Sequence, residues 1–192
     1  MRIIGGTARG LHLTPLGAGD QAAHLRPTSD RVREAIFNLL INGGYGNPVS
    51  GARVLDVFAG TGALGLEALS RGAARATFIE NGAVSARILA QNIALLRAQD
   101  RCTILRQDVL RGVTGQFDLI FLDPPYGKQM GEAALTVLRP NLASEALIIW
   151  EENTRPSPPP GFDLLDQRKY GDTLVSILSV DKSDETNPPV TG

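Results

Sequence analysis

The chain has 192 residues, which is the size of one α/β domain and too short for two full domains. Hydrophobic residues make up 43% of the chain and charged residues 20%, proportions that exclude a disordered or fibrous protein. The formal net charge of −1, from 19 basic and 20 acidic residues, argues against a protein that coats nucleic acid without specificity.

Residues 1–25 are predicted to form a short extension, punctuated by glycine, with possible strands at residues 2–4 and 11–14. Positive charge gathers at this end, because residues 1–37 contain five arginines and three acids. Only three of the chain's 19 basic residues are lysines. Arginine suits bidentate contacts with phosphate, but the same bias is expected from a GC-rich genome, and both explanations remain open.

A regular alternation of helices and strands follows the extension. The cluster that ends in Ser29 and Asp30 marks a helix start. Strands are predicted over residues 54–58, 76–80, 102–105, 117–122 and 146–151, and helices over residues 63–70, 83–96 and 129–138. In the helix over 83–96, we expect Val84, Ile88 and Leu95 to share one face. Continuous apolar strands that alternate with helices predict an α/β fold with a doubly wound, mostly parallel sheet.

The end of the chain is predicted to close the sheet. Residues 162–169 and 173–180 face each other across a Tyr-Gly-Asp turn and predict a hairpin. We therefore place one catalytic domain over residues 26–181. The polar segment over residues 182–192 contains Pro188-Pro189 and is expected to be a disordered tail.

Two further features bear on the compartment. The first residues lack the apolar core of a signal peptide, and no apolar run approaches the roughly 20 residues of a membrane helix. A single cysteine, Cys102, excludes an internal disulfide and a cysteine-cluster metal site. We therefore expect a cytoplasmic protein with no bound metal and no membrane partner.

A glycine-rich loop between a strand and a helix is the strongest local signal. Gly60, Gly62 and Gly65 have the G-x-G-x-x-G spacing, in which glycines allow a tight turn and a close approach of the backbone to a ligand. Glu80 ends the next strand, twenty residues after Gly60, where a carboxylate can accept both hydroxyls of a ribose. These features fit a nicotinamide dinucleotide and also S-adenosylmethionine.

Acidic residues near the loop separate these two cofactors by charge. A dinucleotide would place a pyrophosphate over the loop, whereas S-adenosylmethionine carries a sulfonium and an α-ammonium. Asp56, four residues before the first glycine, would repel the pyrophosphate and help to neutralise the cation, although it can also simply cap the turn. Asp108, after the third strand, can accept the adenine amine or serve as a turn residue. The pattern favours S-adenosylmethionine.

The segment Asp123-Pro124-Pro125-Tyr126 follows the fourth strand, at the edge where doubly wound sheets bind ligands. The prolines fix the backbone and remove two N–H donors, which leaves the Asp123 carboxylate and the Pro124 carbonyl as acceptors. Two acceptors suit an amine on an aromatic base, and Tyr126 offers a face on which that base can stack. A base in a helix must first be flipped out. The alternative is a rigid turn with a surface tyrosine.

These two loops, in this order and at this separation, resemble class I S-adenosylmethionine-dependent amino-methyltransferases. Four segments are further similar to the bacterial 16S ribosomal RNA guanine-N2 methyltransferases: MRIIGG at residues 1–6, RPTSDRVRE at 26–34, GALGLEALSRGA at 62–73 and YGDT at 170–173. The resemblance implies a Rossmann-like sheet of seven strands and S-adenosylmethionine as cofactor. It implies methylation of a guanine amine in the 16S rRNA of an assembled or assembling small ribosomal subunit.

The resemblance also implies roles for single residues. The expected cofactor contacts are Asp56, Phe58, Ala59, Gly60, Thr61, Gly62, Glu80, Asn81, Asp108 and Val109. The expected catalytic residues are Asp123, Pro124, Pro125 and Tyr126, and the expected RNA contacts are Arg2, Arg9, Arg26, Arg33 and Lys128. We expect residues 1–25 to face the RNA and to contribute little to the fold of a monomeric enzyme. The competing expectation is that they cover an apolar face of the sheet.

Three other interpretations fit part of the pattern. A DNA adenine methyltransferase would use the same Asp-Pro-Pro-Tyr loop, but the chain has little room for a target-recognition domain. A nicotinamide oxidoreductase leaves Asp56 and that loop unexplained. A non-catalytic RNA-binding module would bind RNA whether or not S-adenosylmethionine is present.

Overall fold

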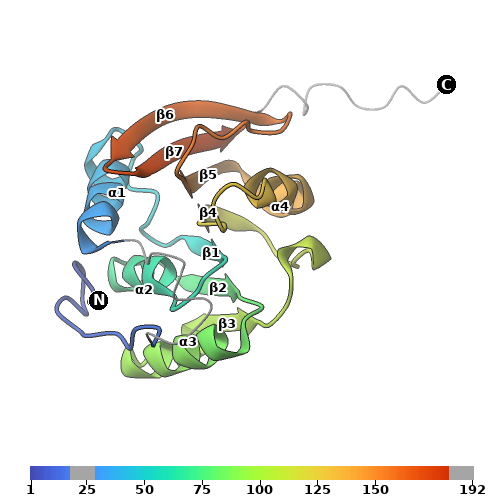
Figure 1. Cartoon of the computed structure of the whole chain (residues 1–192). Helices are drawn as coiled ribbons and strands as arrows, with labels where there is room; N and C mark the ends of the chain where they lie inside the picture. The colour runs from blue at the N-terminus through green and yellow to red at the C-terminus, as the bar shows by residue number, and fades with distance from the viewer. Residues whose placement is uncertain (18–28, 182–192) are drawn as a thin grey trace.

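The computed structural model describes residues 1–17 and 29–181. Seven strands form one sheet in the order β3-β2-β1-β4-β5-β7-β6 (Figure 1). The five parallel strands are β1 (Arg53–Val57), β2 (Arg75–Ile79), β3 (Cys102–Leu105), β4 (Phe117–Leu122) and β5 (Leu142–Glu152). Strands β6 (Phe162–Tyr170) and β7 (Thr173–Val180) form the predicted antiparallel hairpin, and β7 pairs with β5. The predicted α/β, doubly wound, mostly parallel sheet is confirmed.

Helices cover both faces of this sheet (Figure 1). One face carries α1 (Asp30–Asn42), α2 (Ala63–Ser70) and α3 (Ala83–Leu95), and the other carries α4 (Met130–Leu138). Short 3₁₀ helices lie at Gln99–Arg101 (η2), Val109–Arg111 (η3) and Arg139–Asn141 (η4). Strand order reverses at β1, which has β2 on one side and β4 on the other. The loops after β1 and β4 therefore meet at the topological switch point, where such sheets bind ligands.

Helix α1 begins as the sequence predicts, because the Ser29 hydroxyl accepts the N–H of Val32 at 3.3 Å. None of the helices among residues 1–17 and 29–181 is long and apolar enough to cross a membrane.

Residues 1–14, here called the N-terminal segment, pack against the core through two buried side chains. Ile3 and Leu13 are 1% and 4% exposed and pack into the apolar cluster under α1 and α2. The two strands expected in this segment reduce to one antiparallel bridge between Arg2 and His12. The expectation that the extension contributes little to the fold is therefore wrong for these residues. Burial of Ile3 and Leu13 stabilises the fold, whereas a solvent-exposed arm would gain no such stability from its apolar side chains.

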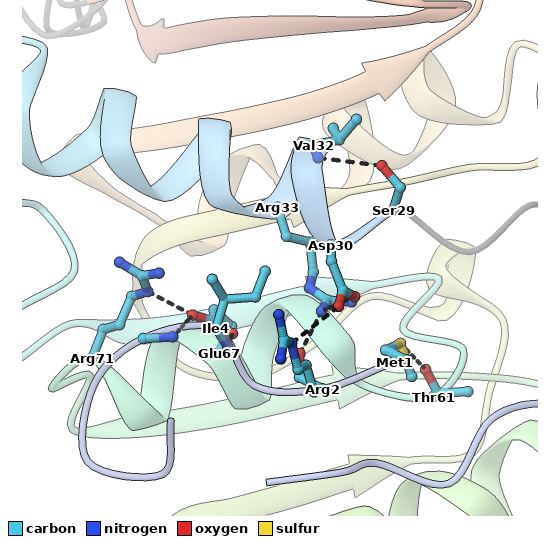
Figure 2. A network of polar contacts seen from close by, with 11 residues as sticks. Met1, Arg2, Ile4, Ser29, Asp30, Val32, Arg33, Thr61, Glu67 and Arg71 are labelled. Atoms are coloured by element: carbon cyan, nitrogen blue, oxygen red, sulfur yellow. Dashed lines mark hydrogen bonds and ion pairs between the residues drawn. The ribbon is translucent and has the colours of Figure 1, made fainter. Parts of the chain in front are cut away.

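Glu67, fully buried on α2, anchors the N-terminal segment (Figure 2). Its carboxylate accepts the backbone N–H groups of Ile4 and Gly5, both at 2.8 Å, and the Nε–H of Arg71 at 2.7 Å. At Gly6, which has φ of +77°, an added Cβ would lie 1.8 Å from the carbonyl oxygen of Ser70. Only glycine allows the segment to approach α2 this closely.

Arg33 requires a correction. Its side chain has no exposed surface, and Nη2 donates to the Arg2 carbonyl at 2.6 Å and to Asp30 at 2.9 Å (Figure 2). A guanidinium committed to these internal partners cannot reach a phosphate, so the prediction that Arg33 contacts RNA is wrong. Arg26 and the tail at residues 182–192 lie outside the described residues.

Candidate cofactor and substrate site

The glycine loop connects β1 to α2 through a series of left-handed residues. Phe58, Gly60 and Gly62 have φ values of +60°, +54° and +79°. Gly62 is the N-cap of α2, and a Cβ added there would meet Leu89 at 2.3 Å. Phe58 adopts a conformation that costs a non-glycine residue energy, which is a feature of ligand-binding loops. The loop is thus shaped by close backbone packing, as the G-x-G-x-x-G spacing predicts.

Glu80 follows β2, and its carboxylate accepts hydrogen bonds from the backbone of two loops. One carboxylate oxygen accepts the N–H of Gly60 at 2.8 Å, and the other accepts the N–H of Gly82 at 2.6 Å. These bonds fix a carboxylate directly beside the glycine loop. The side chain is only partly buried, so it remains accessible to a ligand at that position.

Asp56 is 2% exposed and accepts the N–H of Gly65 at 2.9 Å. Burial raises the pKa of Asp56 to about 8, the Gly65 N–H opposes that rise, and the charges of Asp123 and Glu80 add to it. The carboxyl groups of Asp56, Glu80 and Asp123, at the ends of β1, β2 and β4, therefore interact electrostatically across the switch point. Acids grouped in this way favour a bound cation over an anion, and a cation bound there would draw Asp56 into its charged form. Among the residues that the structure describes, no three His, Cys, Asp or Glu side chains are arranged to hold a metal ion.

The Asp-Pro-Pro-Tyr loop lies beside the glycine loop because β1 and β4 are adjacent and in register, with Val57 opposite Leu122. Pro124 is buried, and Asp123 and Pro125 are partly exposed. Tyr126 is 37% exposed and hydrogen-bonds to the side chain of Thr173. Burial raises the pKa of the Tyr126 hydroxyl, and the acids around it raise it further, so the phenol is neutral at physiological pH.

A family model described as "Conserved hypothetical protein 95" matches residues 1–179 of the chain. The chain belongs to this family. A relative from Escherichia coli strain K12, named "Ribosomal RNA small subunit methyltransferase D", is 36% identical over 196 residues, which cover 97% of this chain and 93% of the relative. The protein of the same name from Haemophilus influenzae is 37% identical over 181 residues, 89% of each chain.

Solved structures agree with this assignment. A solved structure titled "Putative methyltransferase yhhF from Escherichia coli" matches with a TM-score of 0.80 at 36% identity, covering 94% of this chain and 98% of that one. A hypothetical protein from a Thermus species matches with a TM-score of 0.71 at 28% identity, over 94% of this chain and 99% of that one. The likeness therefore extends over the N-terminal segment, both loops and the hairpin.

Three other residues predicted to contact the cofactor are Asp108, Val109 and Asn81. Asp108 follows β3 and caps η3, because its carboxylate accepts the N–H of Leu110 at 2.8 Å. Val109 is buried in the core on the α4 side, and Asn81 is exposed directly after Glu80. Asp108 therefore acts as a turn residue, which is one of the two roles that the sequence allows. Its contact with adenine stays a prediction.

Two residues that contact the Asp-Pro-Pro-Tyr loop and the glycine after it were missed by sequence reasoning. Thr173 holds Tyr126, and Glu152, at the end of β5, accepts backbone N–H groups from Asn153 and Gly127. Burial raises the pKa of Glu152, and these two N–H groups oppose that rise. In the sequence, the YGDT segment could have pointed to Thr173, and an acid at the end of a predicted strand could have pointed to Glu152. Gly127 and Glu152 also line a hollow of about 600 Å³ next to the loop.

Proposed function

We propose that this protein transfers a methyl group from S-adenosylmethionine to the exocyclic N2 amine of a guanine in the 16S rRNA of the small ribosomal subunit. The proposal rests on one observation. The glycine loop, with Asp56 and Glu80 beside it, lies next to the Asp-Pro-Pro-Tyr loop at the switch point. The relatives named as small-subunit rRNA methyltransferases support the RNA substrate. Methylation of DNA adenine is not favoured by these relatives.

The residues present fit this cofactor. Asp56 and Glu80 hydrogen-bond to N–H groups of the glycine loop, where acids suit a sulfonium and an ammonium and would repel a pyrophosphate. Glu80 is in place to accept hydroxyls of a ribose. When bound, the cofactor supplies an electrophilic methyl group, and the remaining contacts predicted at residues 58–62, Asn81, Asp108 and Val109 belong to the same proposal.

The protein's own part in the reaction is to prepare the amine. The Asp123 carboxylate and the Pro124 carbonyl accept the two N–H groups of the guanine N2 amine, which directs its lone pair away from the ring. Tyr126 supplies a neutral aromatic face for the flipped base. The amine gains a methyl group and must lose one proton, and the Asp123 carboxylate is the nearest proposed acceptor for it.

RNA contact is assigned to exposed basic residues. Arg2 and Arg9 lie on the N-terminal segment, and Lys128 follows the catalytic loop; all three are exposed. With so few charges, only about two to four phosphates are neutralised, which predicts a shallow salt dependence of RNA binding. Shape recognition of an assembled or assembling subunit must then supply much of the selectivity. We propose that the enzyme acts as a cytoplasmic monomer.

One experiment separates the candidate functions. Labelled S-adenosylmethionine is incubated with the protein and either undermethylated small subunits, free 16S rRNA or duplex DNA, and the modified nucleosides are identified after digestion. N2-methylguanosine from rRNA supports the proposal. N6-methyladenine from DNA would replace it with the alternative methyltransferase, and RNA binding without any transfer would indicate a non-catalytic module.

A further inference from the structure

Thr61, the middle residue of the loop Gly60-Thr61-Gly62, is held from two directions. Its hydroxyl donates to the Sδ of Met1 at 3.8 Å (Figure 2), and its carbonyl accepts an N–H from Nδ2 of Asn92 at 2.9 Å. Met1 begins the N-terminal segment, and Asn92 lies on α3. Two separate elements thus contact one residue of the glycine loop.

Asn92 also binds the other end of the N-terminal segment. Its Oδ1 accepts the N–H of Thr14 at 2.7 Å, and its Nδ2 donates to the Thr14 carbonyl at 3.1 Å as well as to Thr61. The side chain has no exposed surface. A buried amide that uses both its donor group and its acceptor fixes the backbone segments around it, because each lost bond would leave a buried polar group unsatisfied.

We infer that Asn92 is a positioning residue for the cofactor, which holds the glycine loop and the N-terminal segment in one arrangement. Both ends of the segment reach Thr61, Met1 directly and Thr14 through Asn92. The loop cannot leave its observed conformation without breaking this connection. The inference rests on the proposed function in one respect, that the glycine loop binds S-adenosylmethionine.

The test compares Asn92→Ala with Ser70→Ala. The Ser70 hydroxyl donates to the Gly5 carbonyl at 2.6 Å and accepts the N–H of Ala8 at 2.9 Å, so it anchors the same segment to the end of α2 that lies away from the glycine loop. Both variants should melt at a lower temperature than the wild type. Only Asn92→Ala should raise the Kd for S-adenosylmethionine, by about tenfold in calorimetry.

Two further readouts distinguish positioning from a general loss of structure. In Asn92→Ala, kcat at saturating cofactor should stay within about twofold of wild type while the cofactor KM rises, because the Asp123 loop is untouched. Hydrogen exchange at residues 58–66 should speed up in Asn92→Ala and not in Ser70→Ala. If Asn92→Ala does not fold, Asn92→Leu fills the same buried space without a donor or an acceptor and should show the same rise in Kd.

The outcomes separate this inference from the proposed function. An Asn92 variant that binds the cofactor as tightly as wild type overturns the inference, and so does an equal rise in Kd for Ser70→Ala. If the wild-type protein itself binds no S-adenosylmethionine, the proposed function fails first, and the inference with it.

Discussion

The guanidinium of Arg33 donates a hydrogen bond to the backbone carbonyl of Arg2 at 2.6 Å, and so joins α1 to the N-terminal segment inside the core. Burial lowers the pKa of Arg33, while the neighbouring charges of Asp30 and Glu67 raise it and keep the side chain charged. Part of the positive charge at the start of the chain therefore serves the fold rather than the RNA.

The first prediction concerns the stability that this contact provides. Arg33→Met keeps much of the buried volume but leaves the Arg2 carbonyl without this donor, so the free energy of unfolding should fall by about 1–3 kcal/mol. Arg31→Met, on the exposed side of the same helix, is the matched control and should change stability by less than about 0.5 kcal/mol. Urea unfolding measures both. Unchanged stability in Arg33→Met, together with weaker RNA binding, would restore the original assignment.

Local patterns predicted the sheet and the site loops well. Strands β3, β4 and β7 begin and end where their apolar runs do, and α2 begins directly after the last residue of the glycine turn. These elements are encoded by neighbouring residues, through continuous hydrophobicity and through glycines that accept positive φ.

Contacts between distant parts of the chain were not predictable in this way. Val84 and Leu95, expected to share one face of α3 with Ile88, are 37% and 48% exposed, whereas Ile88 and the polar Asn92 are buried. Asn92 is buried because it bonds to Thr14, which is 78 positions away in the sequence. The N-terminal segment was misjudged for the same reason, since its partner Glu67 looks like an ordinary surface residue of an amphipathic helix.

The second prediction concerns pH and stability. The unfolded chain releases the proton of Asp56 near its ordinary pKa of 3.8, whereas the folded protein holds it to about pH 8. The folded state binds more protons between these values, so the Asp56 contribution to the free energy of unfolding falls as pH rises through that window and then levels off. Asp56→Asn keeps an acceptor for Gly65 and should gain stability over wild type as pH rises. Urea unfolding from about pH 5 to about pH 8 measures this difference, and a constant difference would contradict it.

The third prediction follows from the same group. A bound cation favours the charged form of Asp56, so cofactor binding near neutral pH should release up to about one proton. Calorimetry in two buffers with different ionisation enthalpies reports that proton. The Asp56→Asn variant should show no dependence on the buffer. A wild-type protein without buffer dependence would mean that the cation does not sense Asp56.

The fourth prediction concerns Glu80, whose carboxylate binds the N–H groups of Gly60 and Gly82. Glu80→Ala removes hydrogen bonds to a charged group and should weaken cofactor binding by roughly 10- to 150-fold. Glu80→Gln, which keeps one acceptor, should lose less. Glu34→Ala, on the exposed side of α1, should bind as wild type does. Heat from NADH and none from S-adenosylmethionine would overturn the cofactor assignment.

The most direct test of the central claim is the rate of methyl transfer by Asp123 variants, measured in single turnover on undermethylated small subunits. Asp123→Ala should bind S-adenosylmethionine nearly as wild type does but transfer the methyl group about 10²–10³-fold more slowly, because one preorganised acceptor for the reacting amine is lost. Asp123→Asn should be faster than Asp123→Ala, since its carbonyl still accepts one N–H. Equal rates for Asp123→Ala and wild type would contradict the account, because the Asp-Pro-Pro-Tyr loop would then be only a structural turn.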